Sequence, residues 1–366
     1  MSHPGPYPTP YPTDYTVVGA GAIGATLGFA LARAGHHVTL IDTDTAHVAA
    51  LRANGLRVRR PDGTDDRTDI AAAHTPDDAP AHPTGLRRVI LATKSQHTEA
   101  AAAWAAPRLA PDGWIASAQN GPNEPVIAQH VGPERTLGVF VNIFADYLEP
   151  GIIRDGGPGA LAVGLPDGGA PDGRVLELAA HLRAYGPVTA TANLAGYRWA
   201  KRGFGAILGV TTLVDAPIAG TVDRYRDLAA AVARESTETA VRAGIALEAF
   251  DAYEPYAFGD AASAEVREAA LDRLVAWLRT QPKDRSGVFR DLAVRHRPRE
   301  HPAPGHPDPF PALAARHGVP LTAGTALGRL LGEIEAGTRG FSYDNTDELR
   351  RVLRAEQAEP AGPDAL

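Results

Sequence analysis

The chain has 366 residues, which is long for a single hydrophobic core, so two domains are expected. A formal net charge of −7 argues against nucleic-acid binding driven by overall charge, and the absence of cysteine excludes disulfides, thiolate metal sites and cysteine nucleophiles. No run of 18 apolar residues occurs, so we expect no membrane span, and the cysteine-free composition suits a cytoplasmic localisation.

Four segments are expected along the chain. The proline-rich residues 1–14, which lack the features of a signal peptide, and residues 356–366 are predicted to be flexible tails. β-Branched runs alternate with helical patterns over 15–192, whereas apolar residues recur at helical spacing after Asn193. We therefore predict an α/β domain over 15–192 and an all-α domain over 193–355, whose apolar stripes suit a homodimer.

The first predicted strand leads into a glycine-rich turn. From Tyr15 the chain reads YTVVGAGAIG, in which a β-branched run meets Gly19, Gly21 and Gly24 in the spacing GxGxxG. An alanine-rich helix to about Ala34 and the strand HVTLID complete a strand–turn–helix–strand unit of about 30 residues. In this context the motif predicts a Rossmann domain with NAD(P)(H) as cofactor; a purely structural glycine turn is the alternative.

Each part of this turn has its own expected role. Gly19 permits a tight turn, Gly21 lets the backbone approach a pyrophosphate, and Gly24 lets the helix pack closely against the strand. The backbone N–H groups at the start of the helix, at Ala22 and Ile23, are expected to bind the phosphates.

Asp42 ends the second strand, where an acid normally accepts hydrogen bonds from the adenosine ribose hydroxyls. A 2′-phosphate would meet a carboxylate there, and the nearest following arginine is Arg52. Local chemistry therefore favours NAD(H) over NADP(H). The alternative is that Asp42 caps a helix that begins within residues 43–46.

Two later strands end in polar loops. Lys94 follows the strand RRVILAT, and Asn120 follows the strand WIASAQ. Because the carboxyl ends of the strands form the ligand crevice in such a sheet, we expect both residues near the cofactor and its substrate.

The all-α region contains the segment RWAKRGFGAILG, in which Lys201, Gly205 and Gly209 are four residues apart and share one helix face. A lone lysine in an apolar helix is a candidate proton donor, because hydride addition to a carbonyl group leaves negative charge on its oxygen. The alternative is a lysine whose side chain extends along the helix surface into solvent.

Three histidines lie close to an acidic residue in the same half of the chain. His296, His301 and His306 are five residues apart, with Glu300 among them. This spacing matches no helix face and no zinc motif, so no metal is expected.

Taken in order, several of these segments resemble the ketopantoate reductase (2-dehydropantoate 2-reductase) family. The resemblance is that of a divergent member. The matching segments are GAGAIG, ATKSQ, QNGPNE, LEPG, NLAGYRWAK and RSGVFRDLAVRHRPRE. In that family an N-terminal Rossmann domain and a C-terminal helical domain hold NADPH and a small-molecule 2-oxo acid. The resemblance thus favours NADP(H), where Asp42 favours NAD(H).

The resemblance also implies roles for individual residues. Lys201 matches the family's catalytic lysine, and Glu300 matches the acidic residue of the same catalytic and substrate-binding site. Asn120 matches an asparagine near the nicotinamide and the lysine, Lys94 a cofactor-binding lysine, and Ser286 a substrate-contacting serine.

The chain departs from the family one and two helical turns after the lysine. The family has substrate-contacting asparagines there, and this chain has Gly205 and Gly209. The loss of two amides predicts open space and weak turnover of ketopantoate, and favours a bulkier or differently functionalised 2-oxo acid or other carbonyl compound. The alternatives are an imine or opine-type reductase, a redox-neutral isomerase on the same framework, and a non-catalytic dinucleotide sensor.

Overall fold

The computed structural model describes residues 13–60 and 62–358, and it divides into two compact units. Described residues up to Ala195 and the segment Glu300–Pro307 form the first unit, and Gly196–Arg299 with the chain from Asp308 onward forms the second. The short segment that contains Glu300 was expected in the second domain, and it groups with the first. The predicted tails lie for the most part outside the described residues.

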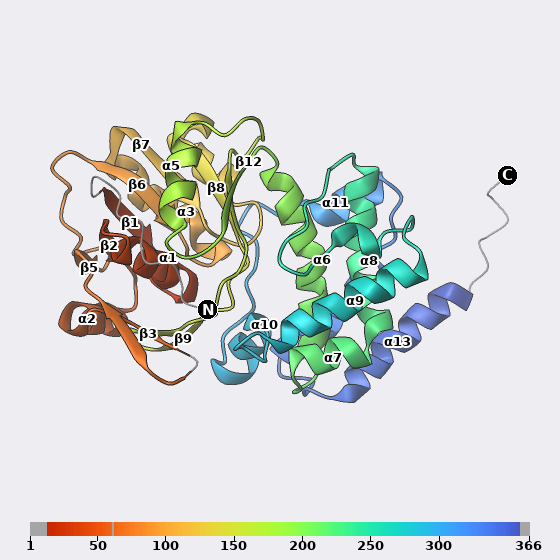
Figure 1. The fold of residues 1–366 in the computed structure, drawn as a ribbon. Coiled ribbons are helices and arrows are strands. Elements are labelled where there is room, and N and C mark those ends of the chain that lie inside the picture. Colours follow the sequence, from red (N-terminus) through yellow and green to blue (C-terminus); the bar gives the residue numbers. More distant parts are fainter. Residues whose placement is uncertain (1–12, 61, 359–366) are drawn as a thin grey trace. The chain divides into compact units, whose positions relative to one another are not determined.

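The first unit is built on an eight-stranded sheet with the strand order β12-β11-β8-β7-β6-β1-β2-β5 (Figure 1). All neighbouring strands are parallel except β8 and β11. The chain reverses its direction of progress at β1, as in a doubly wound dinucleotide-binding fold. The strands are β1 (Asp14–Val18), β2 (His37–Ile41), β5 (Ala72–His74), β6 (Leu86–Leu91), β7 (Leu109–Ser117), β8 (Thr136–Val141), β11 (Leu161–Gly164) and β12 (Val188–Thr191).

Helices cover both faces of this sheet, and alternate residues of β1 show how. Val17 packs with Leu27 of α1 and Leu178 of α5 in one core, whereas Val18 packs with Ala102 of α3 in another. This alternation follows from the period of two along a strand. The helices are α1 (Ala22–Arg33), α2 (Thr45–Asn54), α3 (Thr98–Ala105), α4 (Glu124–Val131) and α5 (Gly173–Leu182), with short 3₁₀ turns at Ser95–His97, Ala106–Arg108 and Pro133–Arg135.

A second, four-stranded sheet in the first unit has the order β4-β3-β10-β9 and was not expected from the sequence. Its strands are β3 (Leu56–Arg59), β4 (Asp65–Thr68), β9 (Asp146–Glu149) and β10 (Ile152–Arg154). β10 pairs with β3 in parallel and with β9 antiparallel, so residues 95 positions apart, such as Arg57 and Ile152, become neighbours. The turn between β9 and β10 contains the LEPG segment and brings Gly151 against Ala50 of α2.

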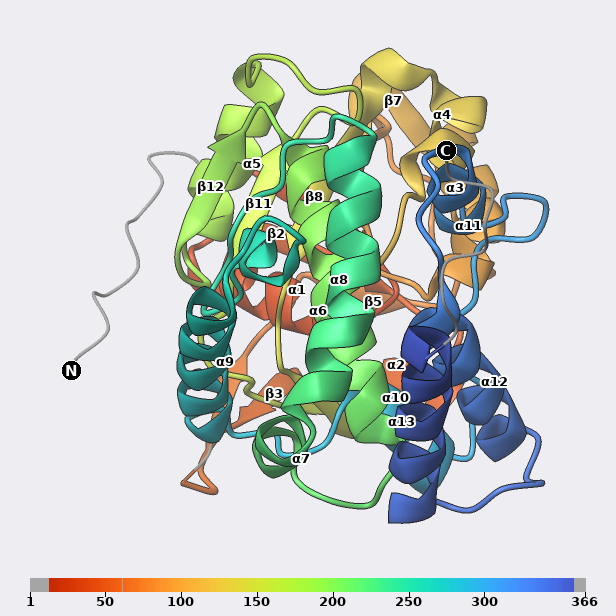
Figure 2. The ribbon, with the colours of Figure 1, turned by 90° about the vertical axis from the view of Figure 1, so that its right-hand side faces the viewer.

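The second unit is helical, and its described residues contain no strand. α6 and α8 lie side by side in both ribbon views (Figure 2), and Gly203 of α6 approaches the Ala233 carbonyl of α8. The α/β fold with a helical C-terminal part is therefore confirmed. The elements are α6 (Leu194–Thr212), α7 (Ile218–Arg224), α8 (Arg226–Arg242), a 3₁₀ turn (Pro255–Phe258), α9 (Ala264–Arg279), α10 (Gly287–Phe289), a π-helical turn (Arg290–Val294), α11 (Phe310–Arg316), α12 (Thr322–Glu335) and α13 (Tyr343–Ala358).

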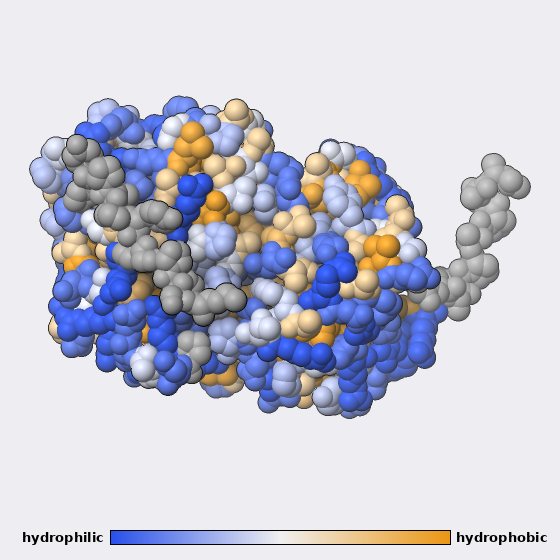
Figure 3. All heavy atoms as spheres, viewed as in Figure 1, coloured by the Kyte–Doolittle hydropathy of each residue, from blue (hydrophilic) through white to orange (hydrophobic). Residues whose placement is uncertain are grey.

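The surface is mainly hydrophilic on the face that Figure 3 shows, with apolar residues in small groups. None of the helices within 13–60 and 62–358 is long and apolar enough to cross a bilayer. The large apolar side chains with the greatest exposure are scattered along the chain, at Leu176, Val241, Tyr256, Val266, Val294 and Tyr343.

Candidate functional site

The glycine-rich turn between β1 and α1 has a shape that its sequence explains. Gly19 has φ +92°, and a Cβ atom there would lie 2.7 Å from the backbone nitrogen of Thr93. A Cβ atom at Gly24 would overlap the carbonyl oxygen of Gly19, so the first and third glycines are required by close packing. A Cβ atom at Gly21 would meet nothing within 4 Å. The middle glycine therefore faces open space, as a backbone that binds a pyrophosphate requires.

The helix that follows presents its amino end at this open space. α1 begins at Ala22, with Gly21 as its N-cap and no acidic residue in its first turn. The first backbone N–H groups, at Ala22 and Ile23, have no acceptor within the helix. They and the helix dipole favour an anion here, so the turn can hold the diphosphate of a dinucleotide.

Asp42, just after β2, is hydrogen-bonded to the glycine-rich turn. Its Oδ2 accepts the backbone N–H of Ala20 at 2.7 Å, and its Oδ1 accepts that of Asp44 at 2.9 Å. The N-cap of α2 is Asp44, which accepts the N–H groups of Ala46 and His47. The alternative that Asp42 caps this helix is therefore wrong. Each carboxylate oxygen keeps one further acceptor position for a ribose hydroxyl.

Arg52, the nearest following arginine, is directed elsewhere. Its Nη2 pairs with Asp78 at 2.6 Å, and its Nε donates to the carbonyl oxygen of Ala73. The site at Asp42 thus offers a carboxylate, while the guanidinium of Arg52 is already paired with Asp78. This arrangement suits ribose hydroxyls better than a 2′-phosphate.

Glu300, Asn120 and Ser95 meet at the carboxyl ends of β6 and β7. Glu300 Oε1 accepts the Ser95 N–H and the Ser95 hydroxyl, both at 2.9 Å. Glu300 Oε2 accepts from Asn120 Nδ2 at 3.0 Å. Two of the predicted site residues, separated by 180 positions in the chain, are thus brought together within the first unit.

A buried polar network lies beneath this cluster. Asn123 Nδ2 donates to Ser95 Oγ and to the carbonyl oxygen of Asn120. Gln119 Nε2 donates to Thr98 Oγ1, which in turn donates to Asn123 Oδ1. Ser95, Gln119, Thr98 and Asn123 are all at most 5% exposed. The sequence places Gln119 in the turn expected near the cofactor, but Ser95, Thr98 and Asn123 were not predicted, although each lies in or beside the ATKSQ and QNGPNE segments.

Lys94 occupies the exposed N-cap position of the 3₁₀ turn that follows β6. It therefore lies at the same edge of the sheet as the glycine-rich turn, as expected for the carboxyl end of a neighbouring parallel strand. Its role in binding the cofactor stays a prediction.

The predicted substrate face of α6 differs in burial from one helical turn to the next. Lys201 is half-buried and Gly205 is exposed, and a Cβ atom at Gly205 would meet nothing within 4 Å. Gly209 is buried, and a Cβ atom there would lie 3.1 Å from Leu327 Cδ2 and 3.7 Å from Leu331 Cδ1. The expectation of open space is wrong for Gly209, because α12 fills that position. It holds for Gly205.

Ser286 is a buried helix-capping residue. It is 4% exposed, and as N-cap of α10 it accepts the Phe289 N–H at 3.0 Å. Its hydroxyl lies 2.8 Å from the hydroxyl of Thr212, the last residue of α6. The substrate contact that the resemblance implies for Ser286 stays a prediction.

The histidines near Glu300 do not assemble a metal site. Within the described part of the chain, no group of three or more His, Cys, Asp or Glu side chains has an arrangement that could hold a metal ion. Two arginines of the same segment form ion pairs instead, Arg295 with Asp291 at 2.8 Å and Arg299 with Glu335 at 2.9 Å.

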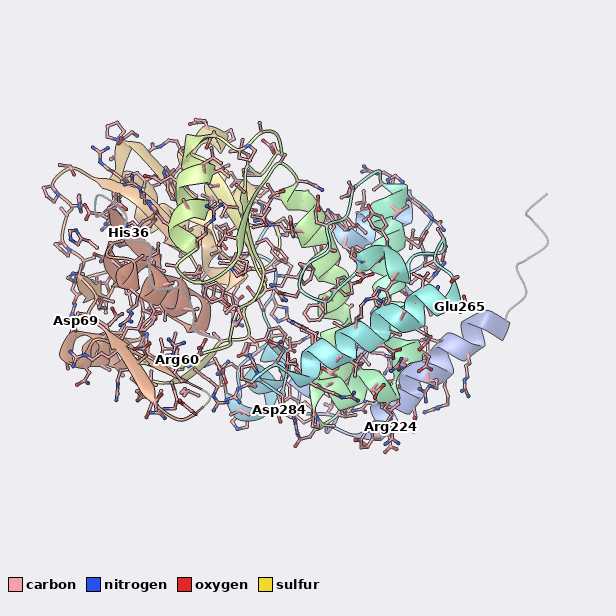
Figure 4. The ribbon with its side chains drawn as sticks, in the orientation of Figure 1. His36, Arg60, Asp69, Arg224, Glu265 and Asp284 are labelled. Carbon is pink, nitrogen blue, oxygen red and sulfur yellow. The ribbon has the colours of Figure 1, made fainter. Side chains whose placement is uncertain are left out.

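A group of titratable side chains lies at the opposite, amino end of the sheet. His36, labelled in Figure 4, precedes β2 and is 4% exposed. Its ring centroid lies 4.2 Å from that of His181, whose Nδ1 is 2.7 Å from the Tyr15 hydroxyl. Burial, followed by the proximity of His181 and Arg88, lowers the pKa of His36 to about 4. This cluster belongs to the core and not to the glycine-rich turn.

Comparison with known proteins supports the expected resemblance. Residues 15–168 match the family model described as ketopantoate reductase PanE/ApbA. A 2-dehydropantoate 2-reductase of Halobacterium salinarum is 34% identical over 187 residues, which cover 50% of this chain and 60% of that protein. The aligned part thus spans less than two thirds of this relative.

Solved structures extend the likeness to both units. A PanE/ApbA family ketopantoate reductase from Ralstonia eutropha matches with a TM-score of 0.68 and 27% identity, covering 88% of this chain and 99% of the other. A D-mandelate dehydrogenase solved with NADH and anilino(oxo)acetate matches with a TM-score of 0.71 and 18% identity, covering 88% and 99%. At this lower identity the second match shows the fold alone. The resemblance to ketopantoate reductases is therefore confirmed.

Proposed function

We propose that the protein is a NAD(H)-dependent reductase or dehydrogenase that acts on a 2-oxo or 2-hydroxy acid, or on a related carbonyl or alcohol. The observation that carries this proposal is the glycine-rich turn, whose open middle glycine, helix start and bound Asp42 fit a dinucleotide. The match of residues 15–168 to ketopantoate reductases supports the same cofactor class and reaction. The bound nicotinamide supplies or accepts the hydride.

In the cofactor site, the chain's own groups bind and orient. The N–H groups at Ala22 and Ile23 bind the diphosphate, and Asp42 accepts hydrogen bonds from the ribose hydroxyls. Because Asp42 is a carboxylate and Arg52 is paired with Asp78, a 2′-phosphate would meet repulsion without a partner. NAD(H) is therefore the proposed cofactor, against the NADP(H) that the family resemblance favours.

In the reaction, Lys201 is the proposed general acid and base. Its ammonium stabilises negative charge on the carbonyl oxygen and donates the proton during reduction. Glu300 and Asn120 are the proposed catalytic partners of the same reaction, and the hydrogen bond between them fixes the orientation of both side chains. The carboxylate of Glu300, held by Ser95, offers acceptors for a substrate hydroxyl.

The proposed substrate is bulkier than ketopantoate. Gly205 offers no amide and leaves the space around its Cα open. An enzyme that lacks this hydrogen-bonding group loses selectivity for a small polar substrate and gains room for a larger one. The cytoplasmic localisation and the homodimer stay predictions.

Steady-state assays test the proposal directly. Oxidation of NADH would be followed with ketopantoate and with 2-oxo acids that carry branched or aromatic side chains, each with and without an added amine. We expect turnover of a bulky 2-oxo acid without the amine, and weak turnover of ketopantoate. Ketopantoate turnover above that of every bulkier acid would refute the proposed substrate class, and strict amine dependence would indicate an imine reductase.

A further inference from the structure

His47 of α2 lies between the glycine-rich turn and the turn of the β9–β10 hairpin. The side chain is 1% exposed. Its Nε2 is 2.9 Å from the carbonyl oxygen of Ala20, and its Nδ1 is 2.9 Å from the backbone nitrogen of Gly151. One buried imidazole thus connects two segments that are more than 100 residues apart in the chain.

The two partners determine where the imidazole proton is. A carbonyl oxygen only accepts, so Nε2 must carry the hydrogen that it shares with Ala20. A backbone N–H only donates, so Nδ1 must be unprotonated toward Gly151. His47 is therefore a neutral imidazole in a single tautomer, and the ring of Tyr147 packs edge-on against it at 5.1 Å.

Both backbone polar groups of Ala20 are hydrogen-bonded to side chains. Its carbonyl oxygen accepts from His47, and its N–H donates to Asp42 at 2.7 Å. Ala20 lies between Gly19 and Gly21, the first two glycines of the motif. These two hydrogen bonds fix the turn from outside its own sequence.

Gly151 is suited to its part in this arrangement. Its φ is +78°, and a Cβ atom there would lie 3.1 Å from the Cβ of Ala50 on α2. A glycine is therefore the residue that lets the hairpin approach α2 closely enough for its N–H to reach His47. This gives the LEPG segment a physical role in the first unit.

We propose that His47 is a positioning residue for dinucleotide binding, which holds the phosphate-binding turn through Ala20 and is itself oriented by Gly151. The inference rests on the proposed function, because it assigns the turn to a cofactor. His47 touches neither the phosphates nor the reacting atoms. Its loss loosens the turn, so that the open face of Gly21 and the carboxylate of Asp42 no longer keep the geometry that binds the cofactor.

The test compares four proteins: wild type, His47→Phe, His47→Gln and a control, His36→Phe. Phenylalanine keeps a ring and loses both hydrogen bonds, whereas glutamine keeps a donor and an acceptor. The control changes another buried histidine of the first unit that does not touch the turn. The readouts are the Kd for NADH by calorimetry, kcat and KM, and hydrogen exchange of the 15–25 segment without cofactor.

We expect His47→Phe to raise the Kd and the KM for NADH about tenfold or more, with kcat changed less than threefold. The same variant should exchange the hydrogens of the turn faster, while His47→Gln and the control stay within about threefold of wild type. If His47→Phe does not fold, His47→Asn, whose side chain is too short to reach both partners, takes its place.

Unchanged affinity and unchanged exchange in a folded His47→Phe variant would overturn the inference. A wild-type protein that binds no dinucleotide would overturn the proposed function instead. In that case faster exchange in His47→Phe would still show that His47 holds the turn.

Discussion

The two units differ in how their candidate residues are held. In the first unit, Asp42 accepts a hydrogen bond from Ala20 of the glycine-rich turn. Glu300 accepts three hydrogen bonds from Ser95 and Asn120. In the second unit, the candidate face of α6 combines a half-buried Lys201 with the open, exposed Gly205. The candidate side chains of the first unit are thus oriented by hydrogen bonds, whereas the candidate face of α6 is distinguished by a position without a side chain.

Glycine shows how strongly packing constrains individual positions in the two units. Gly19 and Gly24 cannot be replaced without backbone overlap, so the dinucleotide-binding turn is tightly constrained. Gly205 has space for a side chain, so nothing in the packing of the second unit forces a glycine there. Each unit has both kinds of position, since Gly21 is open in the first unit and Gly209 is filled in the second.

The largest effect is expected on the second unit, at Lys201. Lys201→Met should lower kcat/KM about 10²- to 10⁴-fold, because the reduced oxygen loses its proton donor, and should leave the Kd for NADH unchanged. Arg202→Met is the matched control, since Arg202 pairs with Asp308 at 2.5 Å in the second unit. Steady-state kinetics and calorimetry measure both quantities. A Lys201→Met variant with near wild-type turnover would contradict the catalytic role proposed for Lys201.

The corresponding change in the first unit should affect selectivity. Asp42→Ala should weaken NADH binding about tenfold or more, because a charge-assisted hydrogen bond to the ribose is lost, and should abolish the preference for NADH over NADPH. Asp44→Ala removes the α2 cap next to it and should lower stability by about 1 kcal/mol without altering selectivity. Calorimetry with both cofactors is the measurement. A wild type that prefers NADPH would contradict the role assigned to Asp42.

Two glycines of α6 test the packing side of the comparison. A Cβ atom at Gly203 would overlap the hydroxyl of the buried Tyr253, so Gly203→Ala should cost about 1–3 kcal/mol of unfolding free energy. Gly205→Ala meets nothing and should stabilise the protein by about 0.5–1 kcal/mol. Urea unfolding measures both. Adding Tyr253→Phe should recover part of the Gly203→Ala loss, and no recovery would place the strain elsewhere.

A further effect is a pH dependence that His36 contributes in the first unit. Because the pKa of His36 is lowered to about 4 in the folded protein, the unfolded chain binds a proton first as the pH falls below about 6.5. The stability that neutral His36 contributes is therefore present above pH 6.5 and lost toward pH 4. We expect a loss of about 1 kcal/mol between pH 7 and pH 5.5. Burial also lowers the pKa of His181, with the same sign.

The measurement is urea unfolding at both pH values, for wild type and for His36→Phe. The variant should lose stability less steeply than wild type over this range. An equal slope in both proteins would assign the pH dependence to other groups.

The features that could be predicted from the sequence are local ones. The glycine-rich turn, Asp42 and the change from an α/β to a helical pattern follow from spacing within about 30 residues. The contacts of Glu300 with Ser95 and of His47 with Gly151 span 205 and 104 residues, and no local pattern reports such pairs. The open space expected at Gly209 is absent for a related reason, because Leu327, which fills it, lies on a helix that is distant in the sequence.

Hydride transfer from isotopically labelled cofactor is the most direct test of the proposed reaction. The enzyme would be incubated with NADH deuterated at either face of C4 and with a set of bulky 2-oxo acids, and the products analysed by mass spectrometry. The proposal predicts a 2-hydroxy acid that carries one deuterium at C2 from one of the two faces, and none with Lys201→Met on the same timescale. NADH binding without deuterium transfer to any of these acids would contradict it.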